Sequence, residues 1–484
     1  MTENTNKKLP KDCDDKRTTS SIKETVIDFS QDSSVHGIKY VGGYDVATIR
    51  KVTWIVMILG SISFCICMIH PRVAVYVKKP VSTKSKIEYR SPMPFPVVTI
   101  CNMNALRLSH LKNHSHLQIL AEKTPFDDLF LTDAIKQVFM NYTYDELLSS
   151  GGHKLNALLF ECYWLNAKIN CSDYFDETYT HYGRCFSFNS YKYIQRTGRK
   201  ALEVTSSGSD QGLWVRIDIE QREYALTSST SLSAGIKVLV HDQTEQPLIR
   251  EYGLAIQPGV EALLGVTFKK TSHLPAPYED GECRNTSDPN MQYPLDYFQH
   301  FSHSSCRREC LLKNIFEVCN CRYQVNDSNY EPCTLLQYYE CVVKIPPARF
   351  DSECVNTCPV PCDVNSYELQ LSTAMTPSNQ AATYFKSHMG VTKEDMRENF
   401  IEMRVYFEQL EYENIYQVPE YEWQQLIADI GGQLGFCIGA SILSVYELGE
   451  FVVIFVVKSC LRVRNLAKSS TEVRPTRLVA EAPV

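Results

Sequence analysis

The chain has 484 residues, of which 44% are hydrophobic, and a formal net charge of −7. This length and apolar content are enough for a large core or several subdomains. The small negative charge gives no reason to expect nucleic-acid binding. The sequence contains no HExxH metal motif, no GxSxG elbow and no phosphate-binding loop, so we predict no enzymatic activity, no cofactor and no metal site.

The N-terminal part reads as a polar tail followed by a membrane span. Residues 1–49 are expected to be a cytosolic tail, whose beginning is rich in Lys, Asp, Thr and Ser, as in disordered segments. No cleavable signal peptide is expected in this polar stretch. Two basic residues then precede an apolar run, residues 52–69, which stops before Pro71. We therefore predict a first transmembrane helix over residues 50–72.

Residues 73–425 are predicted to form one extracellular domain. They hold fourteen of the nineteen cysteines, between Cys101 and Cys362, and this density is typical of an oxidising compartment with up to seven bridges. All Asn-x-Ser/Thr glycosylation sequons fall in the same interval. The sequons are at Asn113, Asn141, Asn170, Asn285 and Asn326.

Helical and strand patterns follow each other within this domain. Residues 105–160 show apolar residues at three- and four-residue spacing, which indicates helices. Strand-like alternation follows, and the last such strand runs almost directly into a second apolar segment, which suggests a gating linkage. The predicted strands are residues 213–220, 235–241, 262–270 and 401–416.

Ten cysteines lie in residues 283–362 and predict a stapled helical subdomain. Cys306 and Cys310 are four residues apart, as are Cys354 and Cys358. Residues at this spacing share a helix face, so two such pairs can form successive disulfide rungs. A zinc site built from the same pairs is the alternative, and an oxidising compartment disfavours it.

The second apolar segment, Leu426–Val457, is the most informative stretch of the chain. Its 32 residues would run about 48 Å as a helix, longer than a bilayer core of about 30 Å requires. The segment also carries three carboxylates, which are costly at membrane depth and favour a water-filled path. Its glycines at every fourth residue fit a helix-packing interface equally well, and the two interpretations are compatible. The carboxylates are Asp429, Glu447 and Glu450, and the glycines are Gly431, Gly435 and Gly439.

Basic residues outside both apolar segments, with the sequons between them, predict two spans with both termini in the cytosol. Membrane lipid is therefore an expected partner. Two other classes share this topology: an ATP-gated two-span receptor, and a membrane-anchored enzyme, receptor or adhesion protein that does not conduct ions. An anchor would have no reason to retain carboxylates in its span.

Several blocks of the sequence together resemble the degenerin/epithelial sodium channel superfamily, near its acid-sensing, bile-acid-sensitive and peptide-gated branch. Residues 431–451 resemble its second-span signature, and the pair His36-Gly37 resembles its cytosolic gating motif. Further matching blocks are residues 95–104, 179–189, 306–310, 319–322 and 358–362.

The resemblance implies an α+β membrane protein that assembles as a homo- or heterotrimer of related subunits. Each subunit would have two transmembrane helices and a disulfide-rich ectodomain with a β-sheet palm and β-ball, a helical finger near residues 103–160, a thumb near residues 283–362, and a knuckle. Residues 426–457 would be the second, pore-lining helix and residues 458–484 a cytosolic tail. The implied bridges are Cys101–Cys185, Cys162–Cys171, Cys283–Cys362, Cys306–Cys358, Cys310–Cys354, Cys319–Cys341 and Cys321–Cys333.

The resemblance also assigns roles within the second span. The tract Gly439, Ala440 and Ser441 matches the selectivity filter, where small residues keep a pore narrow and leave carbonyls or a hydroxyl to replace ion hydration. Three residues match the outer mouth and gate: Ala428, Asp429 and Gly432. The carboxylate of Asp429 could also bind a blocking Ca²⁺. Glu447 and Glu450 match inner carboxylates that could form cation-selective rings.

The resemblance implies a plasma-membrane channel that passes Na⁺ and is blocked by amiloride. Gating by an extracellular peptide ranks first, acid second, and a constitutive or calcium-inhibited leak third. In the thumb loop, only Asp351 and Glu353 are available as acid-sensing carboxylates. The final strand is acidic because it contains Glu408, Glu411 and Glu413. Acid could therefore modulate the channel without being its agonist.

Overall fold

The computed structural model describes residues 22–34, 36–42, 46–122, 132–225, 232–279, 281–285, 295–323, 331–345, 354, 357–439 and 441–469, with the backbone alone at 22–24, 442–443 and 461–469. The chain divides into two compact units. The helical unit comprises Met1–Val81 and Pro419–Val484, and the sheet unit comprises Ser82–Val418.

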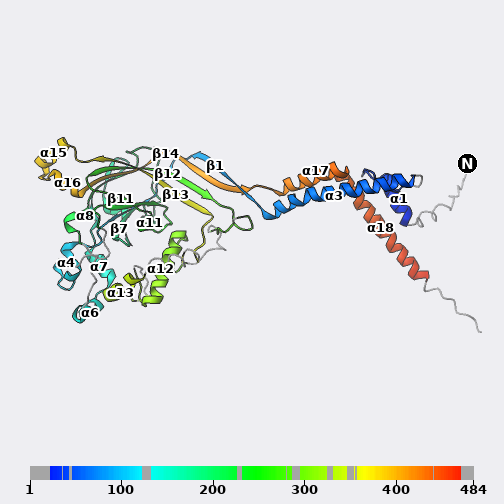
Figure 1. Ribbon diagram of the computed structural model, residues 1–484. Coiled ribbons are helices and arrows are strands. Elements are labelled where there is room, and N and C mark those ends of the chain that lie inside the picture. Colours follow the sequence, from blue (N-terminus) through cyan, green and yellow to red (C-terminus); the bar gives the residue numbers. More distant parts are fainter. Residues whose placement is uncertain are drawn as a thin grey trace, which may run out of the picture. The chain divides into compact units, whose positions relative to one another are not determined.

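The helical unit is built from both ends of the chain. Its long helix α3 packs against α17, and α18 takes a different direction after a break in the helix (Figure 1). The two short helices α1 and α2 precede α3 and contact each other. The helices are α1 (Ile22–Asp32), α2 (Ile38–Gly42), α3 (Thr48–Lys78), α17 (Trp423–Ile438) and α18 (Ile442–Ser469).

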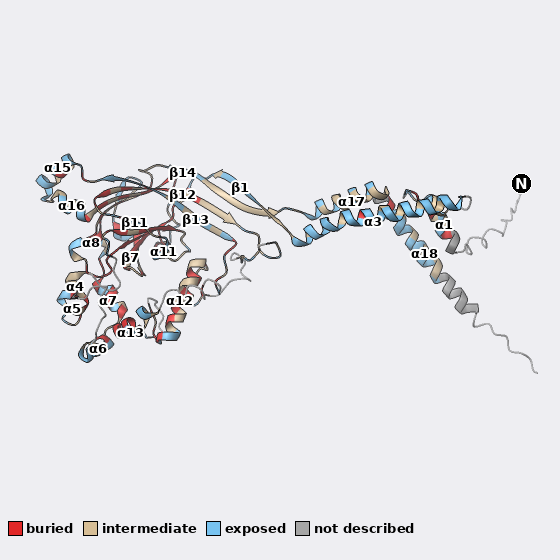
Figure 2. Ribbon diagram, in the orientation of Figure 1, coloured by how far each residue is buried: buried red, intermediate tan, exposed pale blue. Residues whose placement is uncertain are grey.

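Helix α3 is long enough to cross a bilayer. Its 31 residues rise about 46 Å, and among the described residues it is the one helix that is both long and apolar enough for a membrane span. The helix continues through Pro71 and ends at Lys78, beyond the predicted span. A proline removes one backbone hydrogen bond, and a helix can continue past it where a neighbouring helix supports it. Only Cys65 of α3 is buried, and Figure 2 shows the helix exposed along its length.

The larger sheet of the sheet unit has seven strands. It runs in the order β13-β12-β14-β9-β4-β5, with β1 paired to β14. Strands β12 and β14 are parallel, and the other registered pairs are antiparallel. The strands are β1 (Val81–Tyr89), β4 (Leu159–Trp164), β5 (Ala167–Ile169), β9 (Leu213–Asp218), β12 (Val260–Ser272), β13 (Asp363–Met375) and β14 (Phe400–Pro419).

The second sheet has five strands in the order β11-β10-β3-β7-β6. One hydrophobic core is shared by both sheets, so the two pack as layers (Figure 2). The strands are β3 (Val97–Asn102), β6 (Phe175–Thr180), β7 (Gly183–Phe188), β10 (Ile236–His241) and β11 (Leu254–Ile256), and a small pair joins β2 (Met93–Pro94) to β8 (Glu203–Val204).

Alternating burial explains why these segments form strands. In β14, Ile401, Met403, Val405 and Phe407 are buried while the residues between them are partly exposed. A period of two directs alternate side chains to the core. The four predicted strands are confirmed and correspond to β9, β10, β12 and β14.

Helices flank the sheets in three groups. The finger and thumb helices share a second hydrophobic core. The finger contains α4 (Leu108–Asn113), α5 (Gln118–Glu122), α6 (Asp133–Met140), α7 (Tyr144–Gly151) and α8 (Leu155–Leu158). The thumb contains α12 (His303–Cys319) and α13 (Leu335–Glu340), and the knuckle contains α15 (Asn379–Met389) and α16 (Lys393–Asn399). The short helices α9 (Cys171–Tyr174), α10 (Tyr191–Thr197), α11 (Ile249–Tyr252), η1 (Gln221–Glu223) and η3 (Val342–Lys344) lie in connections.

Seven disulfides staple the sheet unit, and they join the same pairs that the family resemblance implies. Two of them are the successive rungs suggested by the four-residue spacing: Cys306–Cys358 and Cys310–Cys354. Five disulfides lie between Cys283 and Cys362, around α12 and α13. Each can contribute about 2–4 kcal/mol by restricting the unfolded chain.

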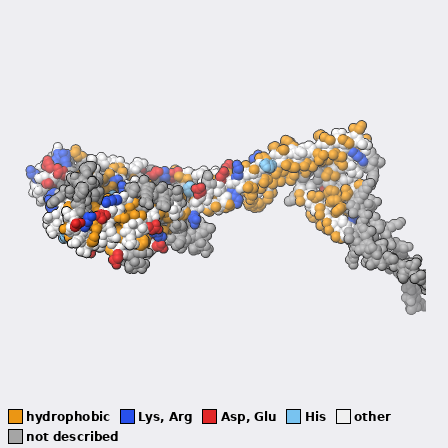
Figure 3. Space-filling view, turned by 60° about the horizontal axis from the view of Figure 1, so that its bottom comes forward, with side chains coloured by type: hydrophobic (Ala, Val, Ile, Leu, Met, Phe, Trp, Pro, Cys, Tyr) orange, Lys and Arg blue, Asp and Glu red, His pale blue; other side chains and the backbone are white. Residues whose placement is uncertain are grey.

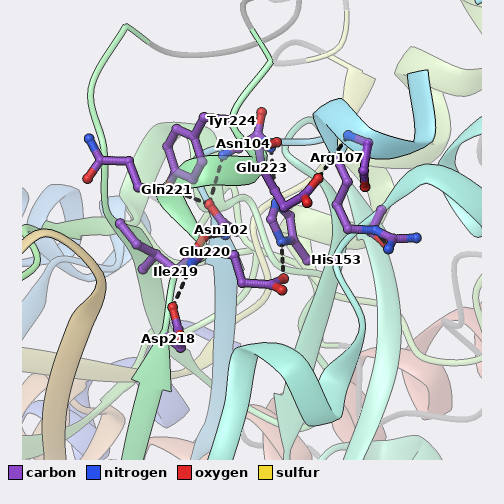
Figure 4. A network of polar contacts seen from close by, with 12 residues as sticks. Asn102, Asn104, Arg107, His153, Asp218, Ile219, Glu220, Gln221, Glu223 and Tyr224 are labelled. Carbon is purple, nitrogen blue, oxygen red and sulfur yellow. Dashed lines mark hydrogen bonds and ion pairs between the residues drawn. The ribbon is translucent and has the colours of Figure 1, made fainter. Parts of the chain in front are cut away.

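A buried polar network joins the finger to both sheets (Figure 4). The side-chain amide of Asn104 donates to the carbonyls of Leu106 (2.7 Å) and Glu223 (3.0 Å) and contacts His153 Nε2 (3.0 Å). His153 Nδ1 lies 2.9 Å from a carboxylate oxygen of Glu220. Since Asn104 and His153 are each only 2% exposed, these hydrogen bonds satisfy buried polar groups at the base of the finger.

Candidate pore segment

The apolar stretch near the C-terminus forms two helices with a break between them. Helix α17 ends at Ile438, and Gly439 follows in the left-handed region with φ 65°. The backbone N–H of Gly439 donates to the carbonyl of Gly435 at 3.0 Å, which closes the last turn. The predicted tract Gly439–Ser441 therefore lies at the break, although its middle residue, Ala440, is outside the described residues.

Ser441 directly precedes the second helix, α18, which begins at Ile442. The N–H of Ser444 contacts Ser441 Oγ at 3.4 Å, and the N–H of Ser441 donates to Ser444 Oγ at 3.1 Å. Val445 N–H donates to the carbonyl of Ser441 at 3.2 Å. A serine at this position satisfies amide groups that the start of a helix leaves unpaired. The sequence thus sets the break from both sides, with a glycine before it and a serine after it.

The N-terminal segment between α1 and α2 lies against this break. The N–H of His36 donates to the carbonyl of Ile438 at 3.3 Å. Ser34 Oγ lies 2.6 Å from Ser444 Oγ, and the N–H of Ser34 donates to a carboxylate oxygen of Glu447 at 3.0 Å. Residues more than 400 positions apart in the chain therefore form one polar cluster.

Two glycines permit this close approach. A Cβ on Gly439 would lie 1.7 Å from His36 Nδ1, so no side chain fits there. A Cβ on Gly37, which has φ 88°, would lie 2.8 Å from a ring carbon of Trp54. The motif His36-Gly37 and the filter tract were separate features in the sequence, and the structure brings them together. Spacing in the sequence carried no signal for this contact.

Aromatic contacts hold the N-terminal segment in place. The rings of Phe29 and Phe451 stack at 4.4 Å, which joins α1 to α18. Tyr40 stacks on Trp54 at 4.9 Å, and the guanidinium of Arg50 lies 4.6 Å from the centre of the Tyr40 ring. Such cation–π and stacking contacts fix α2 on α3.

Asp429, at the predicted outer end of the segment, contacts Tyr421 and Arg72. Tyr421 Oη donates to Asp429 Oδ2 at 2.6 Å, and Arg72 Nε lies 3.7 Å from the same oxygen. Asp429 is therefore partly neutralised within its own chain. The neighbouring residues Ala428 and Gly432 are exposed, and a Cβ on Gly432 would meet nothing within 4 Å.

The two inner carboxylates differ in their surroundings. Glu447 is half-buried and accepts the hydrogen bond from Ser34, whereas Glu450 is exposed. A Cβ on Gly431 would meet nothing within 4 Å among the described residues, so the helix face at this glycine is open for packing. Figure 3 shows hydrophobic side chains over most of the visible face of the helical unit. Such a surface requires lipid or another protein chain to cover it.

Cys437 packs against α3 just before the break. Its carbonyl accepts a hydrogen bond from Ser61 Oγ, and its thiol lies within hydrogen-bonding reach of the buried thiol of Cys65. Cys437 therefore occupies a packing position between α17 and α3.

Glu413 of the final strand, β14, and Glu88 of β1 are each stabilised in the ionised form. A hydrogen bond from Ser85 and then the Lys269 ammonium lower the pKa of Glu413, and hydrogen bonds from Tyr412 and Asn414 lower the pKa of Glu88. Lowered values move both groups away from titration near neutral pH. The thumb residues Asp351 and Glu353, considered for acid sensing, lie outside the described residues.

Three glycosylation sequons have exposed asparagines: Asn113, Asn141 and Asn170. Asn285 is half-buried, and Asn326 lies outside the described residues. Asn170 directly precedes Cys171, which is bonded to Cys162.

Comparisons with known proteins cover nearly the whole chain. The family model described as amiloride-sensitive sodium channel matches residues 29–451. Acid-sensing ion channel 2 of Homo sapiens is 31% identical over 449 residues, which cover 88% of this chain and 85% of that protein. Acid-sensing ion channel 1 of Gallus gallus is 31% identical over 453 residues, with 87% and 82% covered. A cryo-EM structure of a proton-activated chloride channel aligns with 83% of this chain and 98% of its own chain. Its sequence identity of 7% and TM-score of 0.32 are too low to support any inference.

Proposed function

Because the chain belongs to the amiloride-sensitive sodium channel family, we propose that it is one subunit of a trimeric, ligand-gated cation channel. The family is one of ion channels, so the chain is not an enzyme. In this proposal α3 and α17–α18 form two spans of the plasma membrane, both termini are cytosolic, and the sheet unit is extracellular. Na⁺ is the permeant ion, and amiloride blocks the current. Related subunits could replace one or two copies in the trimer.

The observation that carries this proposal is the helix break at Gly439 and Ser441. It supports a narrow pore because the helical segment is interrupted where Gly439 has no side chain, and because Ser441 offers a hydroxyl. Carboxylates lie on either side of the break in the sequence, at Asp429 and at Glu447 and Glu450. A membrane anchor has no use for a broken helix with charges beside it.

Ion selectivity tests the assignment of the filter. We expect Ser441→Ala to change the sodium-to-potassium permeability ratio severalfold, because the hydroxyl no longer substitutes for ion hydration. Reversal potentials under ion substitution measure this ratio. The matched control is Ser63→Ala, an exposed serine of α3. An unchanged ratio in both variants would contradict the filter assignment.

The gate is tested at Ala428. A bulky side chain at this exposed position should prevent closure, so Ala428→Phe is expected to give a constitutive current blocked by amiloride. Whole-cell recording with surface biotinylation separates gating from expression. A normal closed state at full surface expression would contradict the role of Ala428.

An extracellular peptide is the proposed agonist, with acid as the second candidate. Glu413 and Glu88, whose pKa values are lowered, do not titrate in mildly acidic solution, whereas Glu245, whose pKa is raised to about 7, does, so acid stays a candidate. Voltage clamp under peptide application, pH steps and divalent removal distinguishes the candidates. RFamide peptides are the first peptides to apply. A current that appears only when Ca²⁺ is removed would favour a calcium-inhibited leak, with Ca²⁺ bound near Asp429.

Glycosylation tests the proposed topology. Asn113 and Asn141 are exposed and lie in the unit proposed to be extracellular. We expect glycosidase treatment to reduce the apparent mass of the mature chain, and Asn113→Gln and Asn141→Gln each to remove one step of that shift. A chain without glycan at any sequon would count against an extracellular sheet unit.

A further inference from the structure

The sheet unit contains a cavity of about 1130 Å³, and no residue of the candidate pore segment lines it. Its walls come from three parts of the chain. One wall is the loop after β10, a second is the stretch before and within the first turn of α12, and the third is the first half of β13. The cavity is at the large end of the range for ligand sites, so it can admit a molecule the size of a short peptide.

Hydrogen bonds tie the three walls together. Asp242 Oδ2 accepts from Asn365 Nδ2 at 2.9 Å, which joins the loop to β13. The N–H of Gln246 donates to Ser304 Oγ at 3.2 Å, which joins the same loop to α12. Thr244 donates to Asp242 Oδ1 from its N–H and its hydroxyl, at 3.0 and 2.8 Å. The cavity is therefore held open by its own backbone and side chains, as preformed ligand sites are.

Acidic groups dominate the charge of the lining. Asp242, Glu245 and Asp363 line the cavity with Asp296, and the lining contains one cation, Arg307. Asp296 is already paired with Lys313 at 2.6 Å. Burial, and then the neighbouring Asp242, raise the pKa of Glu245 to about 7. Glu245 is half-buried and forms no ion pair with a described residue, so its negative charge has no close positive partner in that part of the chain.

Aromatic rings lie beside these carboxylates. Tyr367 and Phe298 line the cavity together with Tyr252, Tyr297 and Phe301. Burial raises the pKa of the Tyr367 hydroxyl, followed by the charges of Asp242 and Glu245, so the ring and both carboxylates act on one another. Aromatic faces attract cations and also supply apolar contact.

We propose that this cavity binds an organic cation that carries an apolar group, with its positive charge at Asp242 and Glu245 and its apolar part against Tyr367. A bare metal ion is a poorer fit, since the described residues contain no group of three His, Cys, Asp or Glu side chains placed to hold one. The proposal assigns a class of ligand to the channel proposed above. Binding at the cavity does not depend on that function, whereas any effect of the ligand on the current does.

The floor of the cavity lies on strands that lead toward α17 in the sequence. Asp363 begins β13 and accepts a hydrogen bond from Ser272 Oγ at 2.7 Å. Ser272 is also paired with Tyr416 of β14, and β14 ends at Pro419, four residues before α17 begins. A ligand that contacts Asp363 is therefore two strand pairings, β13 to β12 and β12 to β14, away from the strand that precedes α17.

Ligand binding tests the proposal without any need for conduction. The probe is phenethylammonium, and 2-phenylethanol is its neutral isostere of similar shape. Saturation-transfer NMR titrations on the detergent-solubilised full chain measure both affinities. We expect phenethylammonium to bind saturably and at least about tenfold more tightly than the alcohol, since one unmet buried charge is worth about that factor.

Three variants localise the site. Asp242→Asn and Glu245→Gln keep the side-chain shapes, and each should weaken phenethylammonium binding about tenfold while leaving 2-phenylethanol unaffected. Glu203→Gln removes a carboxylate exposed on β8, outside the cavity, and should change neither. Equal affinity for the two probes, the absence of saturable binding, or equal losses in all three variants would overturn the proposal.

Current recordings separate this proposal from the proposed channel function. If the probe binds as expected but shifts no current in a chain that conducts, the site exists without being coupled to the gate. If the chain conducts normally and the probe does not bind, the cavity proposal fails and the channel proposal stands. Binding that depends on Asp242 and Glu245 in a chain that never conducts would leave the site intact and remove the channel proposal.

Discussion

Different interactions stabilise each of the two units of this chain. The sheet unit has hydrophobic clusters of fully buried side chains, a long β-ladder and seven disulfides. In the helical unit, α17 has no buried residue and α3 has only Cys65. Its contacts are polar and aromatic, and they concentrate around the break at Gly439. Its apolar surface faces outward, as Figures 2 and 3 show.

This difference predicts how each unit responds to change. In the sheet unit, a substitution should register as lost unfolding free energy, since most side chains there contact a core. In the helical unit, a substitution should register as altered assembly or current, since lipid or other copies of the chain must cover its apolar faces. The following experiments compare the two responses, from the largest expected effect to the smallest.

Gly439→Ala is expected to abolish the current. A Cβ at this position would lie 1.7 Å from His36 Nδ1, and φ 65° is unfavourable for alanine. The N-terminal segment should therefore leave the break. Gly60→Ala is the control, because a Cβ there meets nothing within 4 Å. Whole-cell current normalised to surface protein is the measurement, and normal current in Gly439→Ala would show that this contact is dispensable.

Loss of one thumb disulfide should destabilise the sheet unit strongly. Removing Cys310–Cys354 by the double change to alanine releases a loop of 44 residues and should cost about 2–4 kcal/mol. The melting temperature of the purified chain in detergent reports this loss. Cys67→Ala, a change at a free exposed cysteine of α3, should leave the melting temperature unchanged. Equal melting temperatures for all three proteins would mean that the thumb does not limit the stability of the unit.

Asn104→Ala should destabilise the base of the finger by about 1–3 kcal/mol. The change removes the amide that donates to the carbonyls of Leu106 and Glu223 in a buried site. Denaturant unfolding measures the loss. Asn156→Ala, an exposed position in α8, is the control. A loss no larger than that of the control would indicate that water replaces the amide in this network.

Much of the sheet unit could be predicted from local pattern. Strict alternation in residues 401–416 gave β14, because one face of that strand packs on the shared core. The family resemblance also implied all seven disulfide pairs that the structure contains, whereas spacing alone reached only the two rungs of the thumb. Family membership, inferred from blocks such as residues 431–451, is confirmed by the match over residues 29–451.

The candidate pore could be predicted only in part. The sequence identified Gly439 and Ser441 as a functional tract, yet it gave no sign that His36 lies against Gly439. The His36 ring and the hydrogen bond from the His36 N–H to the carbonyl of Ile438 join positions far apart in the chain, and a single long-range contact leaves no periodic pattern in the sequence. The cavity at Asp242 and Glu245 could not be predicted from the sequence for a related reason. Its walls come from three distant segments whose local sequences show no distinctive pattern.

Glu245 gives the smallest expected effect, a change in the stability of the sheet unit that depends on pH. Burial raises its pKa from 4.5 to about 7 in the folded chain. The folded state then binds a proton that the unfolded state has released, so stability falls as the pH rises from about 4.5 to about 7 and stays reduced above it. Glu245→Gln should therefore raise the melting temperature at pH 8 and change it little at pH 4.5.

Glu203→Gln, at an exposed site, should show no such dependence, and a pH-independent effect of Glu245→Gln would contradict the unmet charge at this position. If Glu245→Gln both stabilises the sheet unit at pH 8 and weakens phenethylammonium binding, then Glu245 costs stability at neutral pH in the absence of a ligand. A carboxylate that destabilises its own unit until a cation arrives is what a binding site requires, and a purely structural residue would not behave in this way.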